Sequence, residues 1–400
     1  MSATRSVSAR DPRAHGARHR QGAAFATLLM VLGGCSPSAS TGASPQDSAK
    51  NVSTAIAGPL RAASPWLQMS DSGSGVAVWP SGPAFLLLHT TDGWARVTNI
   101  TPIAVPTGGG LTFAAGSGEL VVAALPFDQL LFSPLLRRPI TAASWTPGQT
   151  PGALAPGRNS VAISPRGVTA VLRAGGGTVV EDGQKGWRVL TDAARLAPGR
   201  RLQLDGLSWG VRGRGWLTGH GPGGSHVAFT TTDFGATWSA VGGLGSDVVA
   251  ALTPCGGEQQ WTMPVIRTGG TVALAATSDG GATWVIGAPL TLPAGVPAWG
   301  CHGREVWMLG VADSGEQAGR QAGDDSVYSS INAGLTWTKR GPAPAGVSDL
   351  APTGDHRGFA TSTTSKGPVL WAVSGDGASF SPMALPGWVA SFGDSMVTHD

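Results

Sequence analysis

The chain has 400 residues, of which 61 are glycine, 29 are proline and only 13% are charged. This composition is typical of short strands joined by many turns, and no segment keeps a 3.6-residue apolar period, so we expect little helix. Removing the five arginines and one aspartate of residues 1–34 from the 27 basic and 24 acidic residues leaves 22 and 23. Because the remainder has no excess of positive charge, we expect no nucleic-acid partner.

Residues 1–34 have the pattern of an export signal. Five arginines between Arg5 and Arg20 precede a short apolar stretch, Ala23 to Leu32, which is too short to span a bilayer. The following Leu32-Gly33-Gly34-Cys35 resembles a bacterial lipobox. We therefore expect a lipoprotein signal peptide at 1–34, a lipid anchor at Cys35, and a flexible tether at 35–59 that holds an extracytoplasmic domain on the cell membrane. An ordinary secretory signal with an incidental cysteine is the alternative.

A short motif, which we call the repeated turn, recurs in residues 60–400. Its clearest copies are Thr231–Trp238, Thr277–Trp284 and Ser330–Trp337, with the pattern S/T-x-D-x-G-x-T-W and asparagine for aspartate in the last. The third-position aspartate can accept backbone hydrogen bonds within its own turn, and the glycine can take a positive φ. The tryptophan begins the next strand and offers a large apolar face for packing.

The spacing of this motif predicts the fold. The aromatic markers lie 42 to 53 residues apart, at Trp94, Trp145, Trp187, Trp238, Trp284, Trp337 and Phe380. A second set is expected on the second strand of each unit, at Trp216, Trp261, Trp307 and Phe359. This is the period of a four-stranded propeller blade, so we predict an all-β fold with a single seven-bladed β-propeller at 60–400. Eight blades are the alternative.

The motif resembles the Asp-box, or BNR, repeat of sialidases and related propellers. Its residue pattern is also similar to that of the photosystem II assembly factor family of Asp-box propellers. The resemblance implies that the turns hold the fold together and catalyse nothing, and that ligands bind on the opposite face, over the central channel. We assign such structural roles to Asp92, Asp182, Asp233, Gly235, Trp238, Asp279, Gly281, Trp284, Asn332, Gly334, Trp337 and Asp376.

Cys255 and Cys301 lie 46 residues apart, and each precedes its second-strand tryptophan by six residues. They are therefore predicted at equivalent places in blades five and six. Export to an oxidising compartment favours a disulfide between them. Two separate buried thiols remain the alternative, because equivalent points on adjacent blades can exceed the reach of a disulfide.

The face opposite the turns is the expected ligand face. We place on it Arg137, Arg138, Arg173 and Arg267 as possible ligand residues, together with Arg158, Arg200, Arg201, His220 and His226. Arginines can bind carboxylates or phosphates through paired hydrogen bonds, although scattered solvated arginines are the competing interpretation. An acidic insertion at 312–326 invites a Ca²⁺ site, but its spacing fits no EF-type loop, so we predict no metal and no cofactor.

Enzymatic activity is not supported by the residue pattern. Sialidases of this fold use a tyrosine nucleophile, and the single tyrosine, Tyr328, is predicted in a third strand, away from the channel. The F/Y-R-I-P motif of that family is missing. Propellers of the xyloglucan-hydrolase type use paired carboxylates, but nothing marks two of Asp205, Asp247 and Asp349 as such a pair. We assign no catalytic residue and keep an exo-acting glycoside hydrolase as the alternative function.

We expect a monomeric, non-catalytic scaffold that binds an envelope protein or glycan; a purely structural envelope protein is a further alternative. The last expectation concerns ring closure. Residues 387–394 parallel residues 65–71 in sequence. We expect the C-terminal stretch to pair into blade one and displace residues 66–70.

Overall fold

The computed structural model describes residues 65–389, apart from 70–72, 82–83, 103–110, 117, 125–131, 156–158, 165, 175–176, 184–185, 223–224, 243, 245–247, 252–254, 257–259, 268–270, 293–297 and 311–324. All of them belong to the second of two compact units, Met1–Gly58 and Pro59–Asp400. The expected signal peptide, Cys35 and the tether lie outside the described residues. Within the described part of the chain, no helix is long and apolar enough to cross a membrane.

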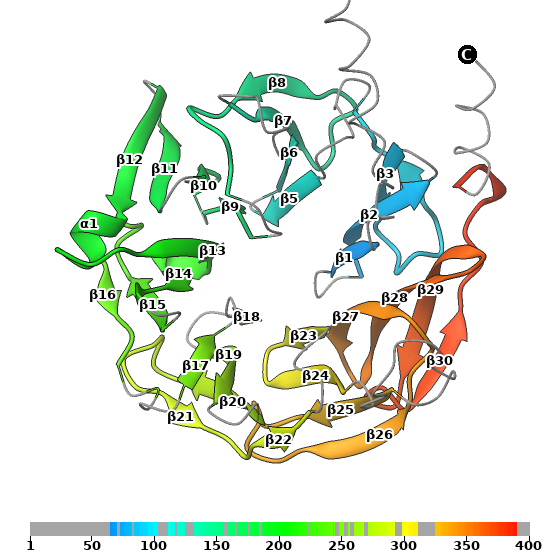
Figure 1. Cartoon of the computed structure of the whole chain (residues 1–400). Coiled ribbons are helices and arrows are strands. Elements are labelled where there is room, and N and C mark those ends of the chain that lie inside the picture. The colour runs from blue at the N-terminus through cyan, green and yellow to red at the C-terminus, as the bar shows by residue number, and fades with distance from the viewer. Residues whose placement is uncertain are drawn as a thin grey trace, which may run out of the picture. The chain divides into compact units, whose positions relative to one another are not determined.

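The described strands form seven antiparallel sheets arranged as the blades of a ring, and the first strand of each blade lies nearest the centre (Figure 1). Blade one consists of β1 (Trp66–Met69), β2 (Gly75–Ser81), β3 (Ala84–Thr90) and β4 (Thr98–Asn99), and blade two of β5 (Leu111–Gly116), β6 (Glu119–Ala124), β7 (Pro134–Pro139) and β8 (Thr146–Gln149). Blade three consists of β9 (Val161–Ile163), β10 (Thr169–Arg173), β11 (Thr178–Gly183) and β12 (Gly186–Asp192), and blade four of β13 (Gln203–Trp209), β14 (Gly215–His220), β15 (His226–Thr231) and β16 (Ser239–Ala240).

Blade five consists of β17 (Val248–Ala251), β18 (Cys255–Gly256), β19 (Trp261–Arg267), β20 (Thr271–Thr277), β21 (Val285–Ile286) and β22 (Leu290–Thr291). Blade six consists of β23 (Trp299–His302), β24 (Glu305–Gly310), β25 (Ser326–Ser330) and β26 (Thr338–Pro342), and blade seven of β27 (Val347–Gly354), β28 (Arg357–Thr364), β29 (Gly367–Ser374) and β30 (Ser379–Pro382). The seven-bladed β-propeller predicted from the sequence is confirmed, and the alternative of eight blades is wrong. The described elements also include the short helix α1 (Ala193–Leu196) and the 3₁₀ turn η1 (Val211–Gly213).

The aromatic residues expected on second strands are found there. Trp216, Trp261 and Trp307 lie on β14, β19 and β24, and Phe359 lies on β28. Trp216 packs against Trp261 and Trp284 of the next blade, with ring centroids 5.5 and 5.2 Å apart. These rings therefore join neighbouring blades.

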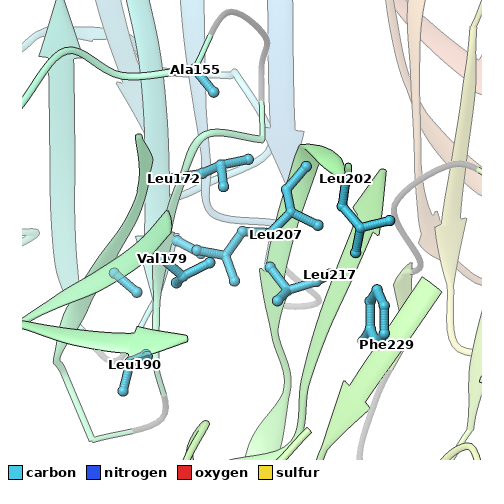
Figure 2. Packing of buried hydrophobic residues seen from close by; sticks show 11 residues of the cluster. Ala155, Leu172, Val179, Leu190, Leu202, Leu207, Leu217 and Phe229 are labelled. Atoms are coloured by element: carbon cyan, nitrogen blue, oxygen red, sulfur yellow. The ribbon is translucent and has the colours of Figure 1, made fainter. Parts of the chain in front are cut away.

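The core lies between the blades. Figure 2 shows the layer between blades three and four, where Leu172 and Val179 meet Leu207 and Leu217. Consecutive residues on middle strands are buried together, as in Leu86–Leu88 of β3, because both faces of each sheet are covered by neighbouring blades. Such continuous apolar runs are typical of strands buried on both sides.

Strand direction alternates within each blade, so the loops separate onto two ends of the ring. One end, the turn rim, carries the connections from first to second and from third to fourth strands. The other end, the loop rim, carries the connections from second to third strands and those between blades. The repeated turns Thr231–Trp238, Thr277–Trp284 and Ser330–Trp337 connect third to fourth strands and lie on the turn rim.

The ring closes differently from our expectation. The innermost strand of blade one is β1, whose Trp66 pairs with Val78 of β2, so the expectation that the C-terminal stretch displaces residues 66–70 is wrong. Instead, the Leu67 N–H donates to Asp349 Oδ2 of β27 at 2.8 Å. Val389 packs into the apolar cluster between blades one and seven. Closure therefore uses side chains across the seam rather than an exchanged strand.

Candidate functional site

The repeated turns of blades four and five share one set of hydrogen bonds. Asp279 Oδ1 accepts from Thr277 Oγ1 at 2.7 Å and from the Thr283 N–H at 2.9 Å, and Thr277 Oγ1 accepts from the Gly281 N–H at 2.8 Å. Asp233 and its neighbours repeat this pattern. Hydrogen bonds from Thr283 lower the pKa of Asp279. Burial acts to raise the pKa of Asp233, but hydrogen bonds from Thr237 and Thr231 outweigh it and lower that pKa.

Asn332 makes an equivalent network in blade six. Its Oδ1 accepts from the Thr336 N–H at 2.9 Å, and its Nδ2 donates to Thr336 Oγ1 at 2.9 Å. In blade five the corresponding hydroxyl, Thr283 Oγ1, donates to the aspartate instead. The rotatable hydroxyl accommodates either side chain because it can donate or accept.

The glycines of these turns share one backbone conformation, whereas the tryptophans make different contacts. Gly235, Gly281 and Gly334 have φ of 84°, 97° and 84°, which favours glycine. Trp284 is buried against Trp216 of blade four. Trp238 Nε1 donates to the Gly235 carbonyl at 3.1 Å, and Trp337 Nε1 donates to the Ala288 carbonyl at 3.1 Å.

The turn of blade one is aligned differently from the sequence prediction. Asp92 Oδ1 accepts from the Arg96 N–H at 2.8 Å, as expected of a third-position aspartate. Trp94, however, occupies the fifth position: it has a φ of 70°, and its N–H donates to Thr90 Oγ1 at 2.8 Å. The sequence marker at Trp94 was therefore misaligned within its turn.

Asp182 and Asp376 do not take the third position that we assigned to them. Asp182 lies within β11, opposite Trp187, and its carboxylate forms an ion pair with Arg137 of blade two. Asp376 has a φ of 60° and its N–H donates to the His356 carbonyl at 3.2 Å. The fourth residue of the blade-four turn, Phe234, does the same: it has a φ of 59° and its N–H donates to the Gly213 carbonyl. The Asp376 carboxylate binds Arg340 and His356. Sequence spacing missed this, because it does not show which residues of a turn have positive φ.

The two later cysteines lie on neighbouring inner strands. Cys255 lies on β18 and Cys301 on β23, and these two strands contact each other. Cys301 is disulfide-bonded. The side chain of Cys255 lies outside what the structure describes, so its pairing with Cys301 stays a prediction.

Arg137 and Arg138 do not lie on the expected ligand face. Strand β7 runs from the loop rim to the turn rim, and both arginines lie near its final residue, Pro139. The Arg137 guanidinium pairs with Asp182 and lies 5.8 Å from the Trp187 ring centroid. Arg138 is buried and lies 5.5 Å from the Trp145 ring centroid. Their placement on the ligand face is wrong: Arg137 joins blade two to blade three, and Arg138 packs against Trp145 of its own blade.

The other two predicted ligand residues lie on the loop rim but on separate blades. Arg173 ends β10 in blade three, and Arg267 ends β19 in blade five. Arg158, residues 312–324 of the acidic insertion and Asp247 lie outside the described residues. The structure therefore does not bring the four predicted arginines together.

A histidine pair occupies the loop rim of blade four. His220 Nδ1 lies 2.8 Å from Asp205 Oδ2, and the rings of His220 and His226 have centroids 4.1 Å apart. Burial, together with the proximity of His220, lowers the pKa of His226. Asp205, one of the candidate catalytic carboxylates, is thus held by His220 and also accepts from Thr218 Oγ1 at 3.0 Å.

A pocket of about 270 Å³ lies among the inner strands of blades one to four, in the central channel. It is lined by aromatic and aliphatic residues and by the polar residues Gln68, Asn159 and Ser208. The Trp66 and Phe113 rings in its wall have centroids 4.1 Å apart. No ionisable side chain lines this pocket among the described residues. Sequence analysis did not identify these residues, because first-strand positions facing the channel have no motif of their own.

A second hollow, of about 310 Å³, lies on the turn rim between blades five and six. Its wall includes Trp261, Arg304, Val285 and Leu335. Val285 and Leu335 are exposed to 58% and 46%. The turn rim is therefore not uniformly polar.

Three donor side chains also converge on the turn rim, between blades six and seven. One potential ligand atom from each of Glu305, His356 and Asp376 lies within 4.8 Å of the other two. Burial and the neighbouring Asp376 raise the pKa of Glu305, and the hydrogen bond to Asp376 raises the pKa of His356. Sequence analysis predicted no metal ligand here, since the three residues are 51 and 20 positions apart in the chain.

No protein-family model matches the chain, and no curated protein matches it in sequence. Among solved structures, the GH74 xyloglucanase from Xanthomonas campestris is similar with a TM-score of 0.57 and 16% identity, over 80% of this chain and 52% of that chain. YCF48 bound to D1 peptide is similar with a TM-score of 0.40 and 19% identity, over 60% of this chain and 72% of that chain.

The β-propeller domain of the Trilobed protease from Pyrococcus furiosus is described as having an open velcro topology. It is similar with a TM-score of 0.45 and 11% identity, over 69% of this chain and 84% of that chain. The chain spans about half the length of the xyloglucanase. At these identities the likeness concerns the fold alone, and the xyloglucanase match agrees with the β-propeller built by the seven sheets.

Proposed function

We propose that this chain is a non-catalytic, extracytoplasmic scaffold that binds a protein segment or glycan in its central channel. The observation that carries the proposal is the channel pocket, which combines the Trp66 and Phe113 rings with amide and hydroxyl groups of Gln68, Asn159 and Ser208. Aromatic walls with a few polar groups suit neutral ligands such as sugars or peptide backbone. The hypothesis that arginines on the expected ligand face recognise an acidic ligand has no support from the positions of Arg137 and Arg138.

The positions of the carboxylates support a binding role over hydrolysis. Asp205 is engaged by His220 and Thr218, and Asp349 accepts from the Leu67 N–H at the ring seam. Most glycoside hydrolases, including propellers of the xyloglucan-hydrolase type, use two carboxyl groups that face one substrate bond across a site. Asp205 and Asp349 instead stabilise separate parts of the ring.

The alternative function is an exo-acting glycoside hydrolase. Its support is the fold likeness to the GH74 xyloglucanase, which shows architecture but no shared catalytic residue. Binding and hydrolysis differ in one measurable product, the new reducing end of a cleaved oligosaccharide.

The test uses the full chain with xyloglucan oligosaccharides, peptidoglycan fragments and a panel of unstructured peptides. Calorimetry measures binding, and a reducing-end assay measures cleavage. We expect saturable binding of at least one probe class without cleavage. Gln68→Ala, which alters the exposed polar wall of the pocket, should weaken it. Gln203→Ala is the matched control, an exposed glutamine on inner strand β13 outside the pocket lining.

Release of reducing ends would establish the hydrolase instead. Binding that Gln68→Ala and Gln203→Ala affect equally would place the ligand outside the channel. Absence of binding to every probe would favour a purely structural envelope protein.

We also propose that Cys35 anchors the chain to the membrane through a lipid, with residues 35–59 as the tether. The support is the sequence Leu32-Gly33-Gly34-Cys35 after a basic and then apolar segment. In the full chain expressed in a bacterium, wild type should partition into detergent and Cys35→Ala should not. Equal partition of both proteins into the aqueous phase would indicate an ordinary secretory signal.

A further inference from the structure

A recurring backbone contact aligns the blades residue by residue on the turn rim. In each case, a carbonyl from the connection between first and second strands accepts from an N–H of the connection between third and fourth strands. The pairs are Gly73 with Gly93, Gly118 with Ile140, Gly213 with Phe234, Arg304 with Ala333, and His356 with Asp376. This alignment makes Glu305, which follows Arg304, equivalent to Arg214, which follows Gly213.

At the boundary between blades four and five, the guanidinium of Arg214 lies next to this backbone contact. Arg214 Nη1 donates to the Gly280 carbonyl of blade five at 2.6 Å. A Cβ on Gly280 would lie 1.3 Å from that nitrogen. The guanidinium therefore occupies the space into which a side chain at position 280 would point.

At the boundary between blades six and seven, the same place holds acidic groups and a histidine. Glu305 stands where blade four has Arg214, and Asp376 stands where blade five has Gly280. His356 stands where blade four has Gly213. Two carboxylates thus meet where the sibling boundary has a cation. Asp376 is 6% exposed, and Glu305 Oε1 is buried without a hydrogen-bond partner among the described residues.

The backbone holds two of these donors in conformations that favour glycine. His356 and Asp376 both have a φ of 60°, and Gly213 and Gly280 at the equivalent places have φ of 81° and 74°. The place of Asp376 is taken by Phe234 and Ala333 in blades four and six, with φ of 59° and 57°, so this conformation belongs to the turn itself.

The charge of the cluster also favours a divalent cation. Within the described part of the chain, the carboxylates of Glu305 and Asp376 share one arginine, Arg340, whose Nη2 pairs with Asp376 Oδ2. Arg340 Nε donates to Ser329 Oγ at 2.7 Å, so its position is fixed from behind. Partners of this kind orient a ligating carboxylate and raise metal affinity.

We propose that Glu305, His356 and Asp376 bind a divalent transition-metal ion of the Zn²⁺ class at the turn rim. One imidazole and two carboxylates form a donor set that suits Zn²⁺, and three protein ligands leave a fourth position for water or a group from a partner. The ion joins Glu305 of blade six to His356 and Asp376 of blade seven. This site is independent of ligand binding in the channel.

The test measures Zn²⁺ binding by the full chain, stripped with chelator, in competition with a chromophoric chelator. We expect one Zn²⁺ per chain with loss of affinity of at least about tenfold in Asp376→Gly and in His356→Gly. Both variants install the residue found at the equivalent place of a sibling blade, so the fold should tolerate them. Circular dichroism checks that they fold.

A double variant and a matched control sharpen the result. Glu305→Arg with Asp376→Gly recreates the pair Arg214 and Gly280 and should show no rise of Tm with Zn²⁺, whereas the Tm of wild type rises. His220→Gln removes a different histidine that also bonds an aspartate, and it should bind Zn²⁺ like wild type. Failure of wild type to bind Zn²⁺, or wild-type affinity in folded Asp376→Gly, would overturn the proposal.

Discussion

At the scale of single residues, the residue in the first position of the repeated turn contributes more to stability than the exposed residues of the same turn. Thr277 is buried, and its hydroxyl both donates to Asp279 and accepts from the Gly281 N–H. Thr283, in the seventh position, is exposed, so water can replace its hydroxyl bond to Asp279. The two threonines of one turn therefore differ in energetic weight despite their similar bonds.

Thr277→Val should destabilise the protein by about 1 to 3 kcal/mol, because it leaves the buried Gly281 N–H without its acceptor while keeping the side-chain shape. Urea unfolding measures the change. Thr283→Val is the matched control and should cost less, because its site is open to water. Equal losses in the two variants would contradict this account.

The turn aspartates should make stability depend on acid pH. Hydrogen bonds lower the folded-state pKa of Asp92 and Asp279, and in Asp233 they outweigh burial and lower it as well. Their contribution is complete above the unfolded-state pKa of about 3.9 and is lost as pH falls through the folded-state values. The urea midpoint should therefore fall on acidification. The triple variant Asp92→Asn, Asp233→Asn, Asp279→Asn should show a shallower fall, and an unchanged slope would contradict the assignment.

At the scale of elements, the second strand carries the tryptophan that joins its blade to the next. Trp307 on β24 is 0% exposed and packs with Val327, Leu350 and Ala360 of blades six and seven. The space around it is full: a Cβ on Gly358 would lie 2.8 Å from the Trp307 ring and 2.4 Å from the Ala351 carbonyl. Neighbouring blades thus meet through tight packing around a few large rings.

Trp307→Ala should cost about 3 to 5 kcal/mol of unfolding free energy, because the cavity cannot be filled by the β-strands around it. Val285→Ala, an exposed apolar truncation, should change stability by no more than about 0.5 kcal/mol. Chemical unfolding compares both with wild type. A loss below about 1 kcal/mol for Trp307→Ala would show that the boundary relaxes freely.

Element positions were predictable from sequence where a periodic aromatic marks the strand, as Trp216 and Trp307 do. Alignment within a turn was not, since Trp94 and Asp376 both occupy positive-φ positions that usually favour glycine. The rim on which Arg137 lies depends on where β7 begins and ends, which the surrounding Pro and Leu residues do not reveal. The cluster of Glu305, His356 and Asp376 arises from the packing of two blades, so no local pattern marks it.

At the scale of the whole molecule, polar groups near the ring centre join blades one and seven. Asp349 accepts from the Leu67 N–H, and the Pro65 carbonyl accepts from Ser348 Oγ and Thr361 Oγ1, each at 3.2 Å. Asp349 is 8% exposed, so its carboxylate is shielded from water. This seam brings together residues from opposite ends of the described chain.

Asp349→Ala should lower stability by about 1.5 to 3 kcal/mol, because a bond to a charged acceptor is lost from a buried site. Hydrogen exchange at the Leu67 amide should accelerate more than exchange at amides of blade four. A uniform acceleration in all blades would indicate that the seam does not open separately.

The seam also bears on how the chain order relates to the ring. Each blade is built from strands that are consecutive in sequence, and blades one and seven exchange none of the strands described. Pro65 and Val389 both lie at this seam. The ring therefore has no blade that must come first along the polypeptide. Joining the two ends and cutting a connection between other blades would preserve every sheet, which makes this architecture a natural subject for circular permutation.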